Sequence, residues 1–169
     1  RQFFLQNSDL FSNFGAVRTI APFFTRRIGL ARNAEGKLVE NDIIGGIRLS
    51  GKISNGLKIG LLSMLTNDDL TNEIPSNLNT VLSLNQKVFN RSALKFLFIN
   101  RQTVKDYDFV DQNDTFNRLI GLEYDLNSVD NVWNGRFFIY NSFSPLENEN
   151  GFSGGVRLKK ETREQEISF

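Results

Sequence analysis

Two carboxylates, Glu123 and Asp125, stand two residues apart in the segment GLEYDLN. In an extended strand that rises about 3.3 Å per residue, this spacing places both side chains on one face, about 6.6 Å apart. Paired carboxylates hydrolyse glycosides at separations of about 5–5.5 Å or 6.5–9.5 Å, so the spacing permits that chemistry. Any strand with two acids on one face gives the same separation, and pairing with Arg136 or a neighbouring lysine is the simpler interpretation. We therefore predict no catalytic residues, and a carboxylate-based hydrolase stays an alternative.

Four aspartates, Asp106, Asp108, Asp111 and Asp114, lie close together in the segment DYDFVDQND. Oxygen-rich loops bind Ca²⁺, but an EF-hand loop has the pattern D-x-D-x-D-G and ends with a glutamate. This segment has neither the glycine nor the glutamate. We expect a solvated loop, and we predict neither a metal site nor a cofactor.

Composition narrows the function classes further. The 169 residues include no histidine and no cysteine, which removes the commonest general base, the commonest transition-metal ligand and thiol chemistry. The 20 basic and 19 acidic residues are interleaved along the chain, so no basic patch for nucleic acid is expected. No apolar run has the roughly 20 residues that a membrane helix needs. The chain starts at Arg1 without a secretory signal, and we interpret it as a piece of a longer protein.

The segment 43–65 alternates with a period of two residues, which predicts β-strands. Ile47, Leu49 and Ile59 fall on an apolar face, while Arg48 and Lys52 fall on the opposite face. The pair at 55–56, Asn-Gly, predicts a type I′ hairpin, in which both central residues have positive φ.

The same pattern recurs downstream without a domain boundary, over 80–89 and 93–101, over 116–126 and 133–143, and over 152–160 before a final strand-like EQEISF. Short connections alternate with long polar loops at 67–79, 102–114 and 144–151. Strands of about 9–11 residues, joined by tight turns at one end and long loops at the other, are typical of a transmembrane β-barrel. We therefore predict an all-β, antiparallel up-and-down meander that forms part of such a barrel, with periplasmic tight turns.

Alternation alone leaves two architectures open, because it shows which residues share a face and not which medium that face meets. One is a soluble sandwich with an apolar core, and the other is a membrane barrel with an apolar outside and a polar lumen. The glycines at 46, 60, 121 and 155 favour crowding on the polar face, as in a narrow lumen or against a plug. Aromatic residues near strand ends suit an interfacial girdle: Phe89, Tyr124, Trp133, Phe143 and Phe152. The apolar face has four polar exceptions, which are Gln86, Asn100, Arg118 and Asn141.

Three motifs in about the first 65 residues carry a family resemblance. RQFFLQNSDLF, PFFTRRIGL and IIGGIRLSGKISNGLKIGLL resemble RPFFLEG-DLF, LFYSRRIG and ILGAAKLTGKTGNGLSIGVL of a Gram-negative family. In that family a domain of unknown function follows a family 9-like carbohydrate-binding module. Gln2 departs from the usual proline and Gln6 from the usual acid, and the rest of the chain matches only in style. The matching residues are Phe3, Phe4, Leu5, Asp9, Leu10, Phe11, Arg26, Arg27, Ile28, Gly29, Gly45, Leu49, Gly51, Lys52, Asn55, Gly56, Gly60 and Leu62.

The resemblance implies a cell outer-membrane barrel, of which this chain is an early portion. We expect a lead-in segment over 1–42, with the FFLQNSDLF and FFTRRIGL motifs, and a hairpin meander over 43–169. Arg26, Arg27 and Gly29 are the motif residues with a candidate functional role. The expected lumen-lining residues are Arg48, Lys52, Lys58, Lys95, Glu123 and Arg136.

The predicted function is solute or glycan handling or passage across the outer membrane. The alternatives are a non-channel anchor or subunit of an envelope complex, and a soluble carbohydrate-binding module or hydrolase. Expected partners are outer-membrane lipid, a glycan and other envelope proteins, with no nucleic acid.

Overall fold

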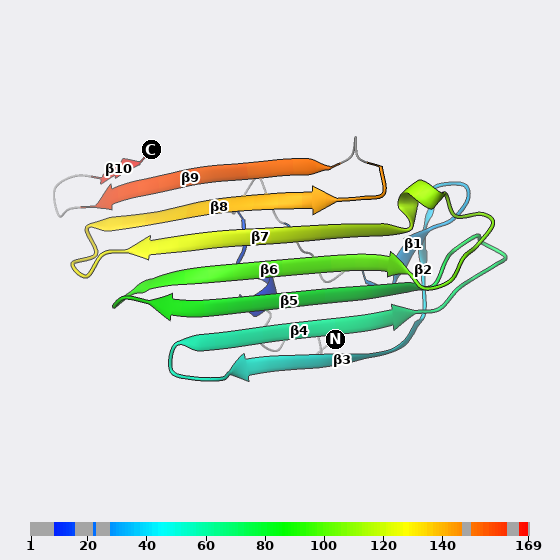
Figure 1. The fold of residues 1–169 in the computed structure, drawn as a ribbon, viewed down its shortest axis with the longest axis horizontal. Coiled ribbons are helices and arrows are strands. Elements are labelled where there is room, and N and C mark those ends of the chain that lie inside the picture. The colour runs from blue at the N-terminus through cyan, green and yellow to red at the C-terminus, as the bar shows by residue number, and fades with distance from the viewer. Residues whose placement is uncertain (1–8, 16–21, 23–27, 147–149, 162–165, 169) are drawn as a thin grey trace.

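The computed structural model describes residues 9–15, 22, 28–146, 150–161 and 166–168, and it is dominated by one antiparallel sheet (Figure 1). Its long strands follow one another in chain order and pair with their sequence neighbours, which confirms the predicted all-β meander. They are β3 (Ile43–Lys52), β4 (Leu57–Thr66), β5 (Asn77–Val88), β6 (Ser92–Thr103), β7 (Phe116–Asn127), β8 (Trp133–Phe143) and β9 (Gly151–Glu161). The short β10 (Glu166–Ser168) adds to β9.

The remaining elements are small. A separate two-stranded sheet is formed by β1 (Leu30–Arg32) and β2 (Leu38–Glu40), which the sequence patterns did not predict. The other two elements are the single helical turn α2 (Asp9–Ser12) and the 3₁₀ turn η2 (Gln112–Asp114).

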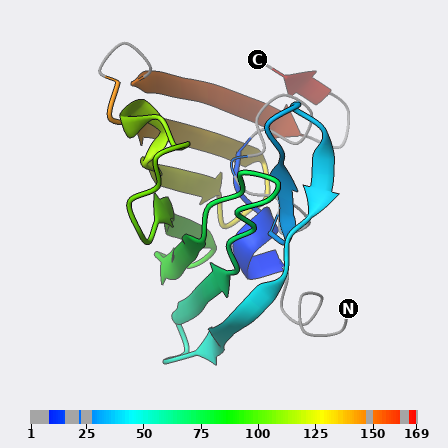
Figure 2. The same ribbon diagram turned by 90° about the vertical axis from the view of Figure 1, so that its right-hand side faces the viewer.

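The sheet is curved and open. Seen along the strands, it follows an arc that is hollow toward the side where α2 and the β1–β2 hairpin lie (Figure 2). The edge strands are β3 and β10, and they do not pair with each other within the described residues. The described strands therefore form an open sheet rather than a closed barrel.

Short and long connections separate to opposite ends of the sheet. The β3–β4, β5–β6 and β7–β8 turns lie at the left end in Figure 1, and the longer β4–β5, β6–β7 and β8–β9 loops lie at the right end. Two of the long loops are linked, because Asp68 accepts hydrogen bonds from Lys105 Nζ at 3.2 Å and from Tyr107 Oη at 3.0 Å. These two donors, Lys105 first, lower the pKa of Asp68. The predicted alternation of turn lengths thus produces two chemically different ends.

The predicted type I′ turn at Asn55-Gly56 is wrong. Neither residue has a positive φ, and the connection comprises the four residues 53–56. The Ser54 hydroxyl accepts hydrogen bonds from the amides of Gly56 and Leu57 at 3.3 and 3.2 Å. The Gly56 carbonyl in turn accepts from the Lys87 amide of the next hairpin at 2.7 Å. These bonds close a wider turn, so the chain does not need the left-handed conformation that a two-residue hairpin requires.

The two faces of the sheet differ in what covers them. On the face that we call the covered face, Leu10, Phe11 and Phe14 of the lead-in segment pack on an apolar centre. That centre comprises Leu62, Met64, Val81, Leu97, Phe138 and Tyr140. The opposite face, which we call the apolar face, carries residues such as Ile47, Leu61, Phe98, Ile120 and Ile139. The core therefore lies on the face that the sequence patterns marked as polar, because cross-strand register gathers apolar residues at its middle.

Candidate functional site: a charged cluster beneath the lead-in segment

All six residues expected to line a lumen lie on the covered face. Cross-strand pairing aligns Lys52 with Lys58, and the row continues through Asn85 to Lys95 and Glu123. Arg136 pairs with Asp125, two residues from Glu123 on the same face. Arg48 lies farther along β3, with its guanidinium carbon 5.5 Å from the centre of the Phe11 ring.

The structure brings three of the six, Lys95, Glu123 and Arg136, into one cluster with Asp125. Lys95 Nζ lies 2.5 Å from Asp125 Oδ2 and 3.6 Å from Glu123 Oε2. Arg136 donates two hydrogen bonds to Asp125, from Nε to Oδ1 at 2.7 Å and from Nη2 to Oδ2 at 3.2 Å. The predicted pairing of the two acids with Arg136 and a lysine is confirmed. Glu123 is only 1% exposed and Lys95 only 3%, while Asp125 and Arg136 are partly buried, so the cluster is an ionic network with a buried centre.

The cluster holds the backbone of the lead-in segment. The Gly15 amide donates to Glu123 Oε1 at 2.5 Å, and Arg136 Nη1 donates to the Gly15 carbonyl at 2.9 Å. Lys95 Nζ donates to the Asn13 carbonyl at 3.0 Å. Gly15 has a φ of 81°, a left-handed conformation that glycine adopts without strain, and this turns the chain onto the acid.

A fifth side chain, Tyr140, completes the network by donating its hydroxyl to Glu123 Oε1. Glu123 Oε1 therefore accepts from a backbone amide and a phenol, and Glu123 Oε2 lies within ion-pair distance of Lys95 and Arg136, at 3.6 and 3.9 Å. Asp125 pairs with the same lysine and arginine. Among the described residues Glu123 Oε2 has no hydrogen-bond partner, and Glu123 is buried beneath the lead-in segment. The geometry fits a clamp that holds this segment rather than an accessible acid–base pair.

Sequence reasoning missed Asn13, Gly15 and Tyr140 as members of this site. The alternating pattern of β8 shows on which face Tyr140 lies, but it does not show that Tyr140 contacts Glu123. The clamp bonds join residues 108 and 121 positions apart, and no local pattern spans that distance. Of these three residues, only Gly15 has a recognisable sequence signal, because a glycine permits a sharp turn in the lead-in segment.

The remaining candidate residues of the sequence analysis lie outside the charged cluster. Gly29 has a φ of 86°, and its carbonyl accepts from the Asn41 amide at 2.9 Å beside the β1–β2 hairpin. Arg26 and Arg27 lie outside the described residues. In the acidic loop, Asp111 caps η2 by accepting from the Asn113 amide, and Asp114 pairs with Arg101. Within the described part of the chain, no group of three or more acidic, histidine or cysteine residues is arranged to hold a metal.

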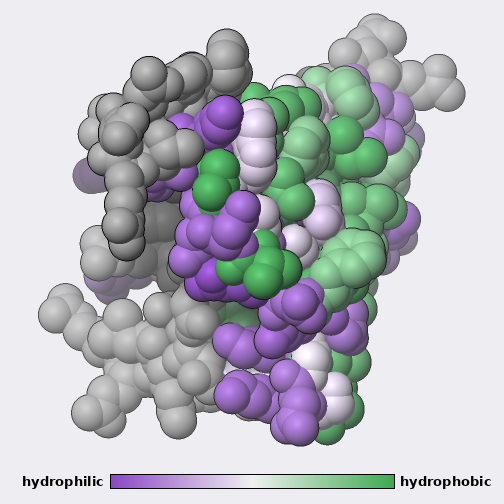
Figure 3. Space-filling model, turned by 90° about the vertical axis from the view of Figure 1, so that its left-hand side faces the viewer, coloured by the Kyte–Doolittle hydropathy of each residue, from purple (hydrophilic) through white to green (hydrophobic). Residues whose placement is uncertain are grey.

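The apolar face is uncovered among the described elements. Large side chains project from it into the surroundings, including Ile47 at 64% exposure, Ile139 at 50% and Val156 at 67%. Figure 3 shows such hydrophobic side chains gathered along one side of the molecule. A contiguous apolar surface of this kind marks a contact with protein, ligand or membrane.

None of the protein-family models, curated proteins or solved structures compared with this chain matches it. In the described part of the chain, no helix has the length and apolarity needed to cross a membrane.

Proposed function

We propose that this chain forms part of the wall of an outer-membrane β-barrel, with the lead-in segment lying on the lumen face. The observation that supports the proposal is that the two sheet faces are arranged opposite to those of a soluble protein. The covered face carries ionic and small residues around its apolar centre, and the more apolar face is exposed. A soluble sandwich buries its apolar face against a second sheet, whereas a membrane barrel turns that face to lipid.

The size of the apolar face supports the proposal. On β8, Trp133 and Phe143 lie on this face at opposite ends of the strand. Ten residue steps at about 3.3 Å span about 33 Å along the strand, or about 25 Å across a bilayer at the usual barrel tilt. Aromatic residues at both limits of a band of that height resemble the two girdles of an outer-membrane barrel.

The family resemblance in the first 65 residues points to the same location. It suggests passage or handling of a solute, with a glycan as the substrate class through the family's carbohydrate-binding module. The remaining strands of the barrel then come from outside these residues, and outer-membrane lipid is the partner of the apolar face.

The clamp supports a second candidate, a non-channel anchor or subunit of an envelope complex. Lead-in residues 9–15 lie on the covered face, and the side chains of Lys95, Glu123 and Arg136 hold Asn13 and Gly15 there. A conducting state requires this segment to leave. Conductance of the full-length protein in planar bilayers separates the candidates, because a channel gives discrete steps and an anchor gives none.

Heat-modifiable migration of the full-length protein in a detergent gel tests the barrel itself. A barrel that stays folded in the detergent migrates differently before and after boiling. A full-length protein that is soluble without detergent would exclude both the channel and the anchor, and would return the soluble carbohydrate-binding module or hydrolase as the best alternatives.

A matched pair of charge substitutions tests which face meets lipid. Leu61→Glu places a carboxylate on the apolar face, and we expect it to impair assembly at a cost of up to about 2 kcal/mol. Lys58→Glu is the control, because Lys58 lies three residues from Leu61 on the same strand but on the covered face. It replaces the Lys52–Lys58 cross-strand pair of like charges with an opposite pair, so it should be tolerated. Damage from Lys58→Glu with tolerance of Leu61→Glu would reverse the assignment of the faces.

A further inference from the structure

One row of polar side chains crosses the apolar face near its long-loop end. Cross-strand register aligns Ser63, Thr80, Asn100 and Arg118 on the four adjacent strands β4 to β7. Ser63 and Thr80 share a hydrogen bond of 3.1 Å, so the row is linked as well as aligned. The next row toward the tight turns is apolar across β4 to β7, with Leu61, Leu82, Phe98 and Ile120, and it continues to Asn141 on β8. Leu65, Leu78 and Phe116 lie one row farther toward the long loops, so the polar row crosses the apolar band near this end.

Arg118 brings a positive charge to this row. Its Nε donates to Asn100 Oδ1 at 3.0 Å, its Nη2 donates to Gln102 Oε1 at 3.4 Å, and its guanidinium carbon lies 4.4 Å from the Phe116 ring centre. No carboxylate of the described residues lies within the 4 Å of an ion pair with it. Two neutral amides and an aromatic ring thus orient the guanidinium without neutralising its charge.

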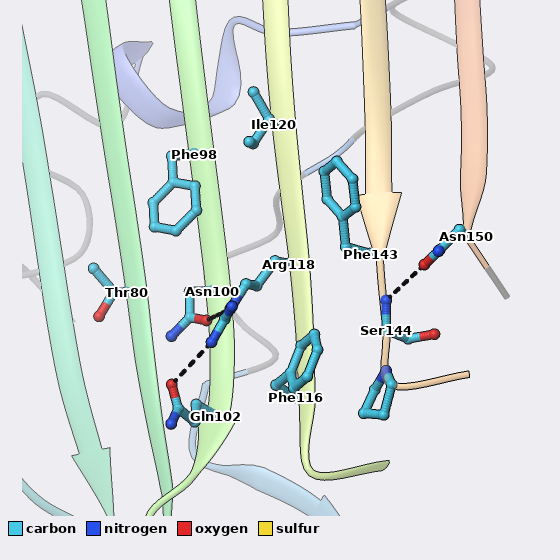
Figure 4. A pocket seen from close by; sticks show the side chains of 11 residues that line it. Thr80, Phe98, Asn100, Gln102, Phe116, Arg118, Ile120, Phe143, Ser144 and Asn150 are labelled. Atoms are coloured by element: carbon cyan, nitrogen blue, oxygen red, sulfur yellow. Dashed lines mark hydrogen bonds between the residues drawn. The ribbon is translucent and has the colours of Figure 1, made fainter. Parts of the chain in front are cut away.

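The guanidinium borders a shallow cleft of about 810 Å³. Figure 4 shows its lining side chains on the apolar side of the sheet, with Asn100, Gln102 and Arg118 at one end and Phe98, Ile120 and Phe143 on its floor. Arg118 occupies the amide oxygens of Asn100 and Gln102, so the NH₂ groups of these residues remain as additional donors beside it. The cleft combines a donor-rich, positively charged end with an apolar floor that continues into the rest of the face.

We propose that this cleft binds the phosphate of a lipid headgroup, with the lipid's acyl chain lying along Phe98 and Ile120. The planar guanidinium matches phosphate oxygens with two parallel donors, and the apolar floor matches a hydrocarbon chain. The site deepens the proposed function and rests on it, because a lipid reaches this face only if the sheet is part of a membrane barrel. A free phosphate shares the headgroup chemistry but leaves the apolar floor without a partner.

Native mass spectrometry of the full-length protein in a neutral detergent tests the proposal. Phosphatidic acid and phosphatidylcholine are added separately, and we expect phosphatidic acid to be retained about tenfold more strongly. Arg118→Gln should remove this preference, and Arg118→Lys should keep part of it as a point charge. Lys160→Gln is the matched control, because Lys160 lies on the same face at the opposite end, 5.6 Å from the Trp133 ring centre. It should leave the preference unchanged.

Two further outcomes separate the ligand sources and the two proposals. Inorganic phosphate at the same concentration should neither bind nor displace phosphatidic acid, and equal binding of inorganic phosphate would overturn the lipid assignment. An unchanged preference in Arg118→Gln would overturn the site. Heat-modifiable migration is measured on every variant. A heat-modifiable protein with no preference for phosphatidic acid rejects only the cleft, whereas a protein soluble without detergent rejects the barrel as well.

Discussion

Glu123 is the residue on which the covered face depends most. Its carboxylate is buried, and only the neighbouring cations, the Tyr140 hydroxyl and the Gly15 amide compensate for its lost hydration. A buried ion pair adds little over an apolar pair, but removing one partner leaves an uncompensated charge, which costs about 3–5 kcal/mol. The cluster therefore specifies where the lead-in segment docks more than it adds stability.

Lys95→Met tests this account at the residue scale. We expect it to lower the free energy of unfolding of the full-length protein by about 3 kcal/mol, because Glu123 and Asp125 lose their shared ammonium group. Adding Glu123→Gln should restore part of the loss, since the acid charge is then removed too. Urea unfolding in detergent measures both variants.

The matched control for that experiment is Lys58→Met. Lys58 lies on the same face, is partly exposed, and makes no ion pair within 4 Å among the described residues. Its loss should cost less than about 1 kcal/mol. Equal costs for Lys95→Met and Lys58→Met would contradict a clamp built on Lys95.

At the scale of elements, α2 and strand β4 meet at a position where only glycine fits. A Cβ atom placed on Gly60 would lie 2.6 Å from Ser83 Oγ and 2.9 Å from Phe11 Cζ. Phe11 is 2% exposed and, with Leu10 and Phe14, belongs to the buried apolar centre of the covered face. The expectation that glycines crowd this face is therefore explained here by docking of a neighbouring segment.

Gly60→Val should displace that segment while leaving the sheet in place. The added methyl groups cannot be accommodated without moving Phe11, at a cost of about 1–3 kcal/mol. Chymotrypsin should then cut after Phe11 or Phe14 faster than in the unchanged protein. Gly51→Val is the control on the apolar face, where an added Cβ meets nothing within 4 Å, and its cleavage rate should stay unchanged. If Gly60→Val were cleaved no faster than the unchanged protein, the position of α2 would not depend on this contact.

At the scale of the whole molecule, the two ends of the sheet are chemically distinct. Tight turns gather at one end, and long loops joined by Asp68, Lys105 and Tyr107 gather at the other. In a barrel of the proposed kind, the tight turns lie in the periplasm and the long loops lie outside the cell. The direction of the wall in the membrane follows from this asymmetry.

Cysteine labelling in intact cells measures that direction. The 169 residues contain no cysteine, so a single introduced thiol in this region reports one position. An Asp108→Cys thiol in a long loop should react with a membrane-impermeant maleimide in intact cells. Asn55→Cys in the β3–β4 turn should react only after the outer membrane is permeabilised. The reverse labelling pattern would invert the orientation, and equal labelling of both thiols in intact cells would contradict a membrane-spanning wall.

The sequence by itself determined the meander, because period-2 alternation and turn composition are local properties. Strand β8 begins and ends at the predicted residues, and β3 begins at Ile43, where the predicted meander starts. The same alternation correctly sorted Arg48, Lys58, Lys95 and Arg136 onto one face. Sequence patterns could not identify a buried centre on that face, because it forms only when five strands align in register.

Tertiary structure decided what each face meets. The lead-in segment docks on the charged face through bonds between residues more than 100 positions apart, and that pairing has no local signature. It also decided the turn at Asn55-Gly56, where the Ser54 hydroxyl and the neighbouring hairpin supply the hydrogen bonds that a tight left-handed turn would otherwise make. Alternation specifies which side chains share a face, and only the position of the rest of the chain specifies whether that face is covered or exposed.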